Sequence, residues 1–388
     1  MPFDPIVDDV FQNRRDFLPG AEPTPEEVQK HFDGSILIDG LTKEESKLVL
    51  SALPRGSHRI YLNPLDKGLS EAKVYAGRYE ANGTMTKPYV FKIGPLKKIE
   101  QESSNIERLV RPTLLGIEKP IFRGGLTKGL VIQPIAGLKP TSRLQSLKDF
   151  ARTSEREVVT DLLSNRLALW YEGHLDTQVK SKPLGSIFTW YLSKLGSVDP
   201  YPPDWNDLKI WVRDLTGCPW HDDLPSIISA LKNYSLSYRP SVIHGDLHSQ
   251  NVLVDELRNS WPIDFYWCTE DTTPLLDLAM LECSLKFLAI HQRSELRSVI
   301  AGVENLLARE PVPSIALGDI PYRSEIQNVL QSVLAVRRYA FQSLNVQFEE
   351  YRKVLCLMTY VHSTHPLLNR PFVLASLQIQ SALQHDSM

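Results

Sequence analysis

Residues 241–267 read SVIHGDLHSQNVLVDELRNSWPIDFYW, and this stretch decides the fold prediction. Three short runs, SVI, NVLVD and PID, have the β-branched or apolar character of strands, so the polar residues fall at strand ends and in the loop between them. Loops held by a rigid scaffold are where catalytic groups usually lie. A hairpin with a two-residue turn between Asn251 and Asp264 would return the chain to Asp246, so we expect three oxygen-bearing side chains to converge.

The chemistry of an Asp, an Asn and a second Asp points to phosphoryl transfer. Carboxylate and amide oxygens are hard ligands that suit Mg²⁺, which keeps water and substrate phosphate as its other ligands. An Asp that does not bind the metal can accept the proton of a hydroxyl group. Kinase-type phosphoryl transfer divides the work in this way.

The segment HGDLHSQNVLVDELRNSWPIDF resembles the H-G-D-x-x-x-x-N and I-D-F/W signatures of the aminoglycoside phosphotransferase-like kinases. The resemblance implies that Asp246 is the catalytic base, that Asn251 and Asp264 are metal ligands, and that His244 is a structural residue holding the loop. Downstream, TPLLDLAMLE is similar to the family's D-P-x-x-D-L-A element, whose aspartate supports the catalytic loop; here that residue is Asp277. The catalytic loop is expected at 244–251 and the metal motif at 263–265.

His248 stands where protein kinases carry Lys, and Gly245 where they carry Arg. His248 either hydrogen-bonds the transferring phosphate or packs beneath the loop, and both roles stay open. The alternation of His244, Asp246 and His248 also raises a transition-metal site, for which further ligands are missing. A third interpretation is a polar turn whose Asp and Asn only cap backbone groups.

Upstream, residues 58–137 contain short β-rich runs with an Asn-Gly hairpin turn and a single helix, KKIEQESSNIERLVRPTL. The run PYVFKIG places Lys92 among apolar neighbours, as the V-A-I-K strand of kinases does for the lysine that holds the α and β phosphates. The helix offers Glu100, Glu102 and Glu107 as its partner. Glu102 best resembles the family's glutamate, and Glu107 is the reserve.

The rest of the nucleotide site is expected on two loops of the same region. In LDKGLSEAKVYAGRY, Gly68 and Ser70 lie where backbone N–H groups of residues 68–72 can face phosphates. A plain hairpin is an equally good interpretation of that stretch alone. In LVIQPIAG, backbone groups from Gln133 to Ile135 are expected to meet the adenine.

These features predict an α+β chain with a bilobal protein-kinase-like fold, in which a small β-rich N-lobe with one helix precedes a large, mostly helical C-lobe. We expect an N-terminal adaptor segment at 1–57, the N-lobe at 58–137 and the C-lobe at 138–388. Within the adaptor segment, TKEESKLVLSAL predicts a helix with Thr42 as N-cap and Glu45 completing a capping box.

Composition excludes several classes of protein. A net charge of −3 and a pI near 6.4 give no electrostatic case for nucleic acid or an anionic membrane. The sequence shows neither a secretory leader nor a long apolar run, so the cytoplasm is the expected location. The four cysteines form no C-x-x-C pair, which argues against a disulfide framework and a cysteine-based zinc site.

More narrowly, KGLSEAKVY, YVFKIG, QESSNIERLV and the catalytic stretch resemble the kinase-like ternary complex associated domain set of bacterial conflict and signalling operons, over about residues 60–290. The first hypothesis is a phosphotransferase that uses ATP or another nucleoside triphosphate with Mg²⁺ and a small-molecule or protein hydroxyl acceptor. The alternative is a kinase-fold signalling or adaptor module that binds nucleotide with little or no turnover and contacts protein partners through 1–57 or the C-terminal helices. A third is nucleotidyl transfer on the same scaffold. Asp222 and Asp223 either hold a cationic acceptor or cap the helix after them.

Overall fold

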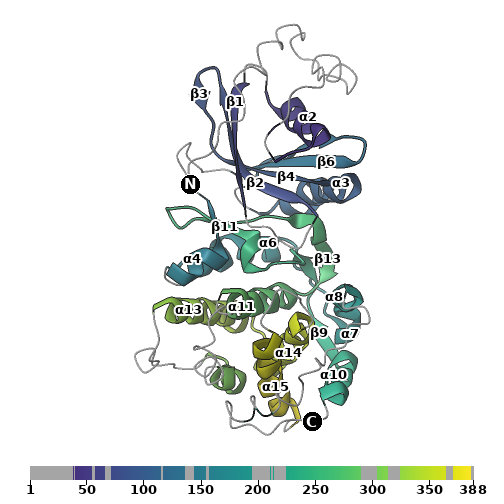
Figure 1. The fold of residues 1–388 in the computed structure, drawn as a ribbon. Coiled ribbons are helices and arrows are strands. Elements are labelled where there is room, and N and C mark those ends of the chain that lie inside the picture. The colour runs from purple at the N-terminus through teal and green to yellow at the C-terminus, as the bar shows by residue number, and fades with distance from the viewer. Residues whose placement is uncertain are drawn as a thin grey trace. The chain divides into compact units, whose positions relative to one another are not determined.

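The computed structural model describes residues 38, 40–54, 57–65, 71–114, 117–135, 144–153, 157–194, 210, 213, 224–289, 304–312, 324–363 and 370–385. The chain divides into two compact units (Figure 1). Unit 1 comprises Met1–Ser146 and Leu253–Cys268, and unit 2 comprises Leu147–Val252 and Thr269–Met388. Unit 1 is rich in strands and unit 2 in helices, so the predicted α+β class is confirmed.

Unit 1 is built on one antiparallel sheet with the strand order β1-β2-β4-β6-β5, and a short β3 pairs with β2. Asn82 and Gly83 join β2 to β3 with φ angles of 52° and 76°. Two positive φ angles are what a two-residue type I′ turn requires, so the predicted Asn-Gly hairpin is confirmed. The strands are β1 (Ser57–Pro64), β2 (Lys73–Ala81), β3 (Thr84–Met85), β4 (Tyr89–Pro95), β5 (Ile121–Gly124) and β6 (Lys128–Pro134).

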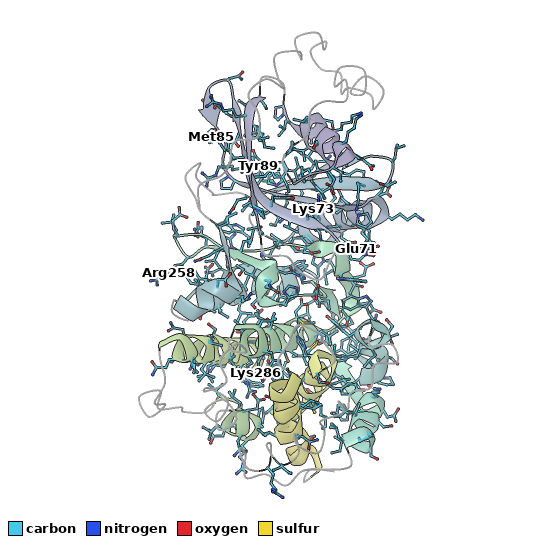
Figure 2. The ribbon with its side chains drawn as sticks, viewed as in Figure 1. Glu71, Lys73, Met85, Tyr89, Arg258 and Lys286 are labelled. Carbon is cyan, nitrogen blue, oxygen red and sulfur yellow. The ribbon has the colours of Figure 1, made fainter. Side chains whose placement is uncertain are left out.

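Helix α2 (Lys43–Ala52) covers one face of this sheet and adds its apolar side chains to the core that contains Phe91 and Ile93 of β4. Thr42 and Glu45 form the predicted capping box, in which each side chain accepts the backbone N–H of the other. Lys73 of β2, which is labelled in Figure 2, donates to Glu45 Oε2 at 2.7 Å and ties the helix to the sheet. This part of the expected adaptor segment is therefore built into the core of unit 1.

The opposite face carries helix α3 (Leu96–Asn105), which continues into a π-helical turn, η2 (Ile106–Val110). Ile99 of α3 rests on the cross-strand pair Gly94 and Gly129. A Cβ atom built on Gly129 would lie 3.0 Å from Ile99 Cβ, so the two glycines let the helix approach the sheet closely.

A second, three-stranded sheet in unit 1 has the order β12-β11-β7, from β7 (Gln145–Ser146), β11 (Val252–Val254) and β12 (Ser260–Pro262). The pairing of β11 with β7 groups this segment with unit 1, whereas the sequence predicts it within the helical C-lobe at 138–388. The hairpin does not have the expected two-residue turn. Its loop runs through 255–259, because Asp255 accepts the N–H groups of Leu257 and Asn259 and holds a longer turn.

Unit 2 is mostly helical, as expected from its periodicity. Two strand pairs interrupt the helices: β8 (Lys180–Pro183) with β9 (Ser235–Tyr238), and β10 (Ser241–Ile243) with β13 (Thr269–Thr272). Across the part of the chain that the structure describes, none of the helices combines the length and apolar character that a bilayer crossing requires. The helices are α4 (Leu147–Thr153), α5 (Glu157–Asp161), α6 (Ala168–Gly173), α7 (Leu184–Ile187), α8 (Thr189–Lys194), α10 (Leu224–Asn233), α11 (Leu275–Ala289), α13 (Ser324–Arg338), α14 (Phe348–Ser363) and α15 (Arg370–His385), with shorter helical turns η3 (Leu162–Leu167), η4 (Ser249–Asn251) and η8 (Tyr339–Ser343).

Candidate functional site

Lys92 is the centre of a buried charge cluster in unit 1. It lies on the face of β4 that α3 covers and is only 6% exposed. Its Nζ atom lies 2.7 Å from Glu102 Oε2 and also pairs with Asp264 Oδ1. The structure therefore brings together three of the residues singled out in the sequence, from a strand, a helix and the segment after β12.

The packing of α3 explains why Glu102 is the partner of Lys92. Ile99 fixes the helix on the glycine pair of the sheet, and Glu102 follows three residues later on the same face. The reserve candidate Glu107 lies in η2, where its half-exposed carboxylate is 3.6 Å from Lys119. Glu100 is exposed.

The cluster holds two carboxylates against one cation. Burial acts to lower the pKa of Lys92, but the charges of Glu102 and Asp264 outweigh it and raise that pKa. Burial raises the pKa of Glu102 to about 7, and the charge of Asp264 acts in the same direction against the opposing effect of Lys92. A further cation near Asp264 would relieve the repulsion between the two carboxylates.

Asp264 has a left-handed backbone, with φ 67° and ψ 65°. This conformation costs a residue with a Cβ about 1–2 kcal/mol, so the surrounding structure must enforce it. A 3₁₀ turn, η5 (Phe265–Trp267), follows directly and contacts α3. Strained residues held by their surroundings are concentrated at functional sites, so the backbone of Asp264 supports a functional role for this residue.

In unit 2, Asp277 organises the predicted catalytic loop. It lies in the first turn of α11, is fully buried, and accepts the backbone N–H groups of His244 at 2.7 Å and Gly245 at 2.9 Å. The hydroxyl of Tyr171 donates to the same carboxylate at 2.9 Å. Gly245 has φ 79°, so the turn at this point favours glycine.

Two further side chains hold the loop, and the sequence analysis missed both. The Tyr191 hydroxyl donates to the carbonyl oxygen of Gly245, directly before Asp246. Ser284 Oγ accepts the N–H of Ser249 at 2.8 Å. Asp277 and Ser284 are two helical turns apart on α11 and so share a face, a spacing that could have pointed to Ser284; no such signal marks Tyr191.

The side chain of Asp246 is partly exposed at the tip of this loop. The backbone carbonyl oxygen of Asp246 accepts a hydrogen bond from Asn251 Nδ2 at 2.9 Å, and the backbone N–H of Asp246 donates to His244 Nδ1 at 3.3 Å. His248 Nδ1 accepts the N–H of Gln250, while Nε2 lies 3.9 Å from Asp246 Oδ2. His248 therefore lies beside Asp246, whereas His244 is completely buried.

Asn251 in unit 2 and Asp264 in unit 1 each carry an oxygen atom of the kind that hard divalent cations bind. The Nδ2 atom of Asn251 is used by the Asp246 carbonyl, so its amide oxygen is the atom that can bind a metal ion. In unit 1, the Asp264 carboxylate lies in the cluster with Lys92 and Glu102, where two carboxylates meet one cation. Among the described residues there is no group of three or more His, Cys, Asp or Glu side chains arranged to hold a metal, and the alternating histidines form none.

The remaining candidates for nucleotide binding are placed only in part. Gly68 and Ser70 lie outside the described residues, as do Asp222 and Asp223. Gln133 is paired with Val90 in the sheet, and its side chain donates to the carbonyl oxygen of Pro262 at 3.4 Å. Ile135 is buried and bridges to Ile117. A contact of this backbone with adenine stays a prediction.

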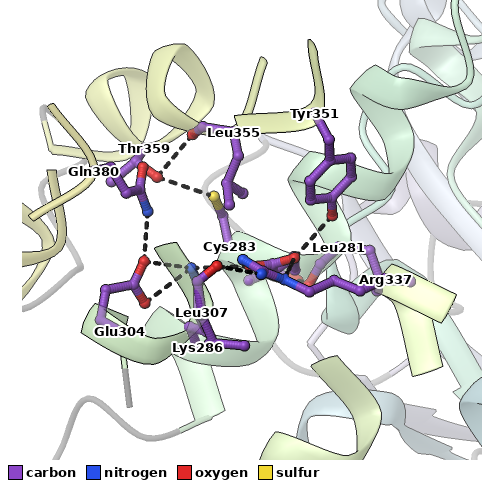
Figure 3. Close-up of polar contacts among 12 residues, drawn as sticks. Leu281, Cys283, Lys286, Glu304, Leu307, Arg337, Tyr351, Leu355, Thr359 and Gln380 are labelled. Atoms are coloured by element: carbon purple, nitrogen blue, oxygen red, sulfur yellow. Dashed lines mark hydrogen bonds and ion pairs between the residues drawn. The ribbon is translucent and has the colours of Figure 1, made fainter. Parts of the chain in front are cut away.

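The other side of α11 carries a buried ion network that joins it to α13, α14 and α15 and to Glu304 (Figure 3). Arg337 donates to both oxygens of Glu282, at 2.8 and 3.0 Å, and Tyr351 donates to Glu282 at 2.8 Å. Lys286 lies 3.2 Å from Glu282 and 3.0 Å from Glu304. Gln380 of α15 also donates to Glu304. The helix that holds the loop is therefore fixed on its other side by paired charges.

Comparison with protein families gives one match, for the family described as Ternary complex associated domain 9, over residues 211–368. The predicted resemblance to the ternary complex associated domain group is confirmed over this segment, which contains the 244–251 loop and α11. No curated protein matches the sequence.

Several solved structures are similar to the chain. A spectinomycin phosphotransferase in complex with ADP and spectinomycin has a TM-score of 0.41 at 12% identity, covering 84% of this chain and 94% of that one. A choline kinase from Streptococcus pneumoniae has a TM-score of 0.38 at 12% identity, over 83% and 94%. An aminoglycoside-3'-phosphotransferase of type VIII has a TM-score of 0.41 at 14% identity, over 82% and 100%. At these values the activity of this chain has to be argued from its own residues.

Proposed function

We propose that the protein is an ATP- and Mg²⁺-dependent phosphotransferase of the aminoglycoside phosphotransferase-like type, which transfers the γ-phosphate to a hydroxyl group. The observation that carries the proposal is the buried cluster of Lys92, Glu102 and Asp264, in a chain whose Asp246 loop is held by Asp277. A structural ion pair alone would not need a second carboxylate in a strained conformation.

Each residue is assigned a role that its contacts support. Glu102 fixes the ammonium of Lys92, which would bind the nucleotide phosphates. Asp264 and Asn251 would hold Mg²⁺, which supplies charge neutralisation for the phosphates when bound. Asp246 would accept the proton of the acceptor hydroxyl while the hydroxyl oxygen forms a bond to the γ-phosphorus. ADP would leave with the electrons of the broken P–O bond.

The first test is Mg²⁺-dependent stabilisation by ATP. Wild type should gain RT ln(1 + [L]/Kd), about 2.7 kcal/mol at one hundred times Kd, and the gain should fall when EDTA removes the metal. Asp264→Ala should lose the Mg²⁺-dependent part, because it removes a carboxylate ligand. Thermal unfolding monitored with ATP, with and without Mg²⁺, measures both.

Asp271→Asn is the matched control, since it also removes one acidic charge, from a half-exposed residue paired with Lys180 and Lys182. Asp271 has φ 64°, a conformation that Asn tolerates. This variant should respond to Mg²⁺ and ATP as wild type does. Equal responses in wild type and Asp264→Ala would contradict the proposed metal site.

The second candidate is a kinase-fold module that binds nucleotide with little turnover inside a protein assembly. The description of the matched family as a ternary complex associated domain favours it. Binding of Mg²⁺ and ATP without any product would support this function. Mass spectrometry of the products separates both functions from nucleotidyl transfer, since the acceptor then gains a nucleotide and not a phosphate.

A further inference from the structure

Besides Glu102, which pairs with Lys92, helix α3 has a second side chain that contacts the segment after Asp264. This side chain is Asn105. The Nδ2 atom of Asn105 donates to the carbonyl oxygens of Phe265 at 2.9 Å and Tyr266 at 3.0 Å. An amide nitrogen has two hydrogens, so both donors of this group are used. Asn105 is only 7% exposed, and the contacts bridge residues far apart in the sequence.

Both backbone polar groups of Phe265, the residue after Asp264, are held by hydrogen bonds. The Phe265 N–H hydrogen-bonds to the Glu102 carboxylate, and the Phe265 carbonyl oxygen accepts Asn105 Nδ2 and the N–H of Cys268. Two of these three groups come from α3, so this helix supports the backbone directly after the left-handed residue Asp264.

The position of Asn105 on α3 suits this task. Glu102 and Asn105 are three residues apart and lie on the same helix face, so one surface of α3 binds both Lys92 and the turn after Asp264. The π-helical turn η2 begins directly after Asn105, and such turns are frequent at functional sites. Gln101, one turn earlier, reaches only the Tyr266 carbonyl, at 3.4 Å and on the exposed side.

We propose that Asn105 is a positioning residue, which locks Asp264 in the left-handed conformation that turns its carboxylate toward Lys92; under the proposed function, on which this inference rests, that carboxylate would hold Mg²⁺. Asn is suited to the position because it presents two N–H donors to two carbonyl oxygens. An Asp at position 105 would be repelled by both carbonyl oxygens and by the carboxylate of Glu102. A Leu of similar size would leave the two carbonyl oxygens without the amide donor.

The test compares Asn105→Leu with Gln101→Leu, which removes the longer and more exposed contact from the same helix. The first readout needs no ligand: hydrogen exchange by mass spectrometry on peptides covering 263–268. Exchange in this segment should become about tenfold faster in Asn105→Leu and stay near wild type in Gln101→Leu. Unchanged exchange in Asn105→Leu would overturn the proposal.

The second readout is the ratio of ATP affinity with Mg²⁺ to ATP affinity in EDTA. Asn105→Leu should lose most of this ratio and keep the affinity in EDTA, because Lys92 and Glu102 remain paired. A ratio equal to that of wild type would show that Asn105 only packs, and would also overturn the proposal.

Failure of the proposed function gives a different pattern. If wild type binds no nucleotide, the phosphotransferase proposal fails, and hydrogen exchange alone then supports or overturns the lock on Asp264. If Asn105→Leu does not fold, Asn105→Ser replaces it. This variant keeps one shorter donor and should show intermediate exchange, and wild-type exchange in it would overturn the proposal.

Discussion

Replacing Arg337 with Met is expected to lower the free energy of unfolding by about 3–5 kcal/mol. Arg337 and Glu282 are at most 1% exposed, and the guanidinium group also donates to the backbone carbonyl of Leu307. The variant would leave Glu282 with less compensation for its burial and the carbonyl without this donor. Urea denaturation followed by far-UV circular dichroism measures the loss.

The matched control removes both members of the pair. Glu282→Leu combined with Arg337→Met leaves no unpaired charge at this position, and Lys286 keeps its contact with Glu304. We expect the double variant to be more stable than the sum of the two single losses predicts. Strict additivity would show that the two residues are not coupled, contrary to their bidentate contact.

The ion pair between Glu282 and Arg337 makes the free energy of unfolding depend on pH. Burial alone would raise the pKa of Glu282, but Arg337 and Lys286 lower it to about 2. Because an unfolded Glu has a pKa of about 4.3, this contribution is present above that pH and is lost as the pH falls toward about 2. Wild type should therefore lose stability across this range more steeply than Arg337→Met does, in urea titrations at each pH. Equal slopes of unfolding free energy against pH in the two proteins would contradict the conclusion that Arg337 lowers the pKa of Glu282.

The parts that the sequence predicted depend on neighbours along the chain. The Thr42 and Glu45 capping box, the Asn82–Gly83 turn and the periodic helices each follow from residues within one or two turns. Lys92 and Glu102 also fall in this group, since a strand leads directly into a helix. Local propensity and spacing suffice for such features.

The parts that it missed depend on contacts between distant segments. Glu282 and Lys286 read as ordinary polar positions in a helix, because their partners Glu304 and Arg337 lie on other helices. Asn105 likewise meets a turn about 160 residues later. A single sequence shows neither which helix faces overlap nor which carbonyl oxygens they leave to be satisfied.

Asp246→Asn is expected to slow phosphoryl transfer about 10²- to 10⁴-fold, the usual contribution of a general base. Asn cannot accept the hydroxyl proton, but it keeps the size of the side chain and leaves the backbone contacts to Asn251 and His244 in place. Binding of Mg²⁺ and ATP should therefore change little. Release of γ-labelled phosphate with water as acceptor, followed by a panel of hydroxyl acceptors, measures the rate.

The comparison of binding with turnover separates the two candidate functions. Asp271→Asn, which removes an equivalent charge away from the loop, should transfer phosphate at the wild-type rate. If Asp246→Asn binds Mg²⁺ and ATP and transfers as fast as wild type, Asp246 is not the base. If wild type and Asp246→Asn bind Mg²⁺ and ATP equally and neither transfers phosphate to any acceptor, the nucleotide acts as a ligand. A general base has no role in binding alone, because no proton has to be removed. The Asp246 loop would then serve the assembly function, and the residues that hold it, Asp277 and Tyr191, would be the next to replace.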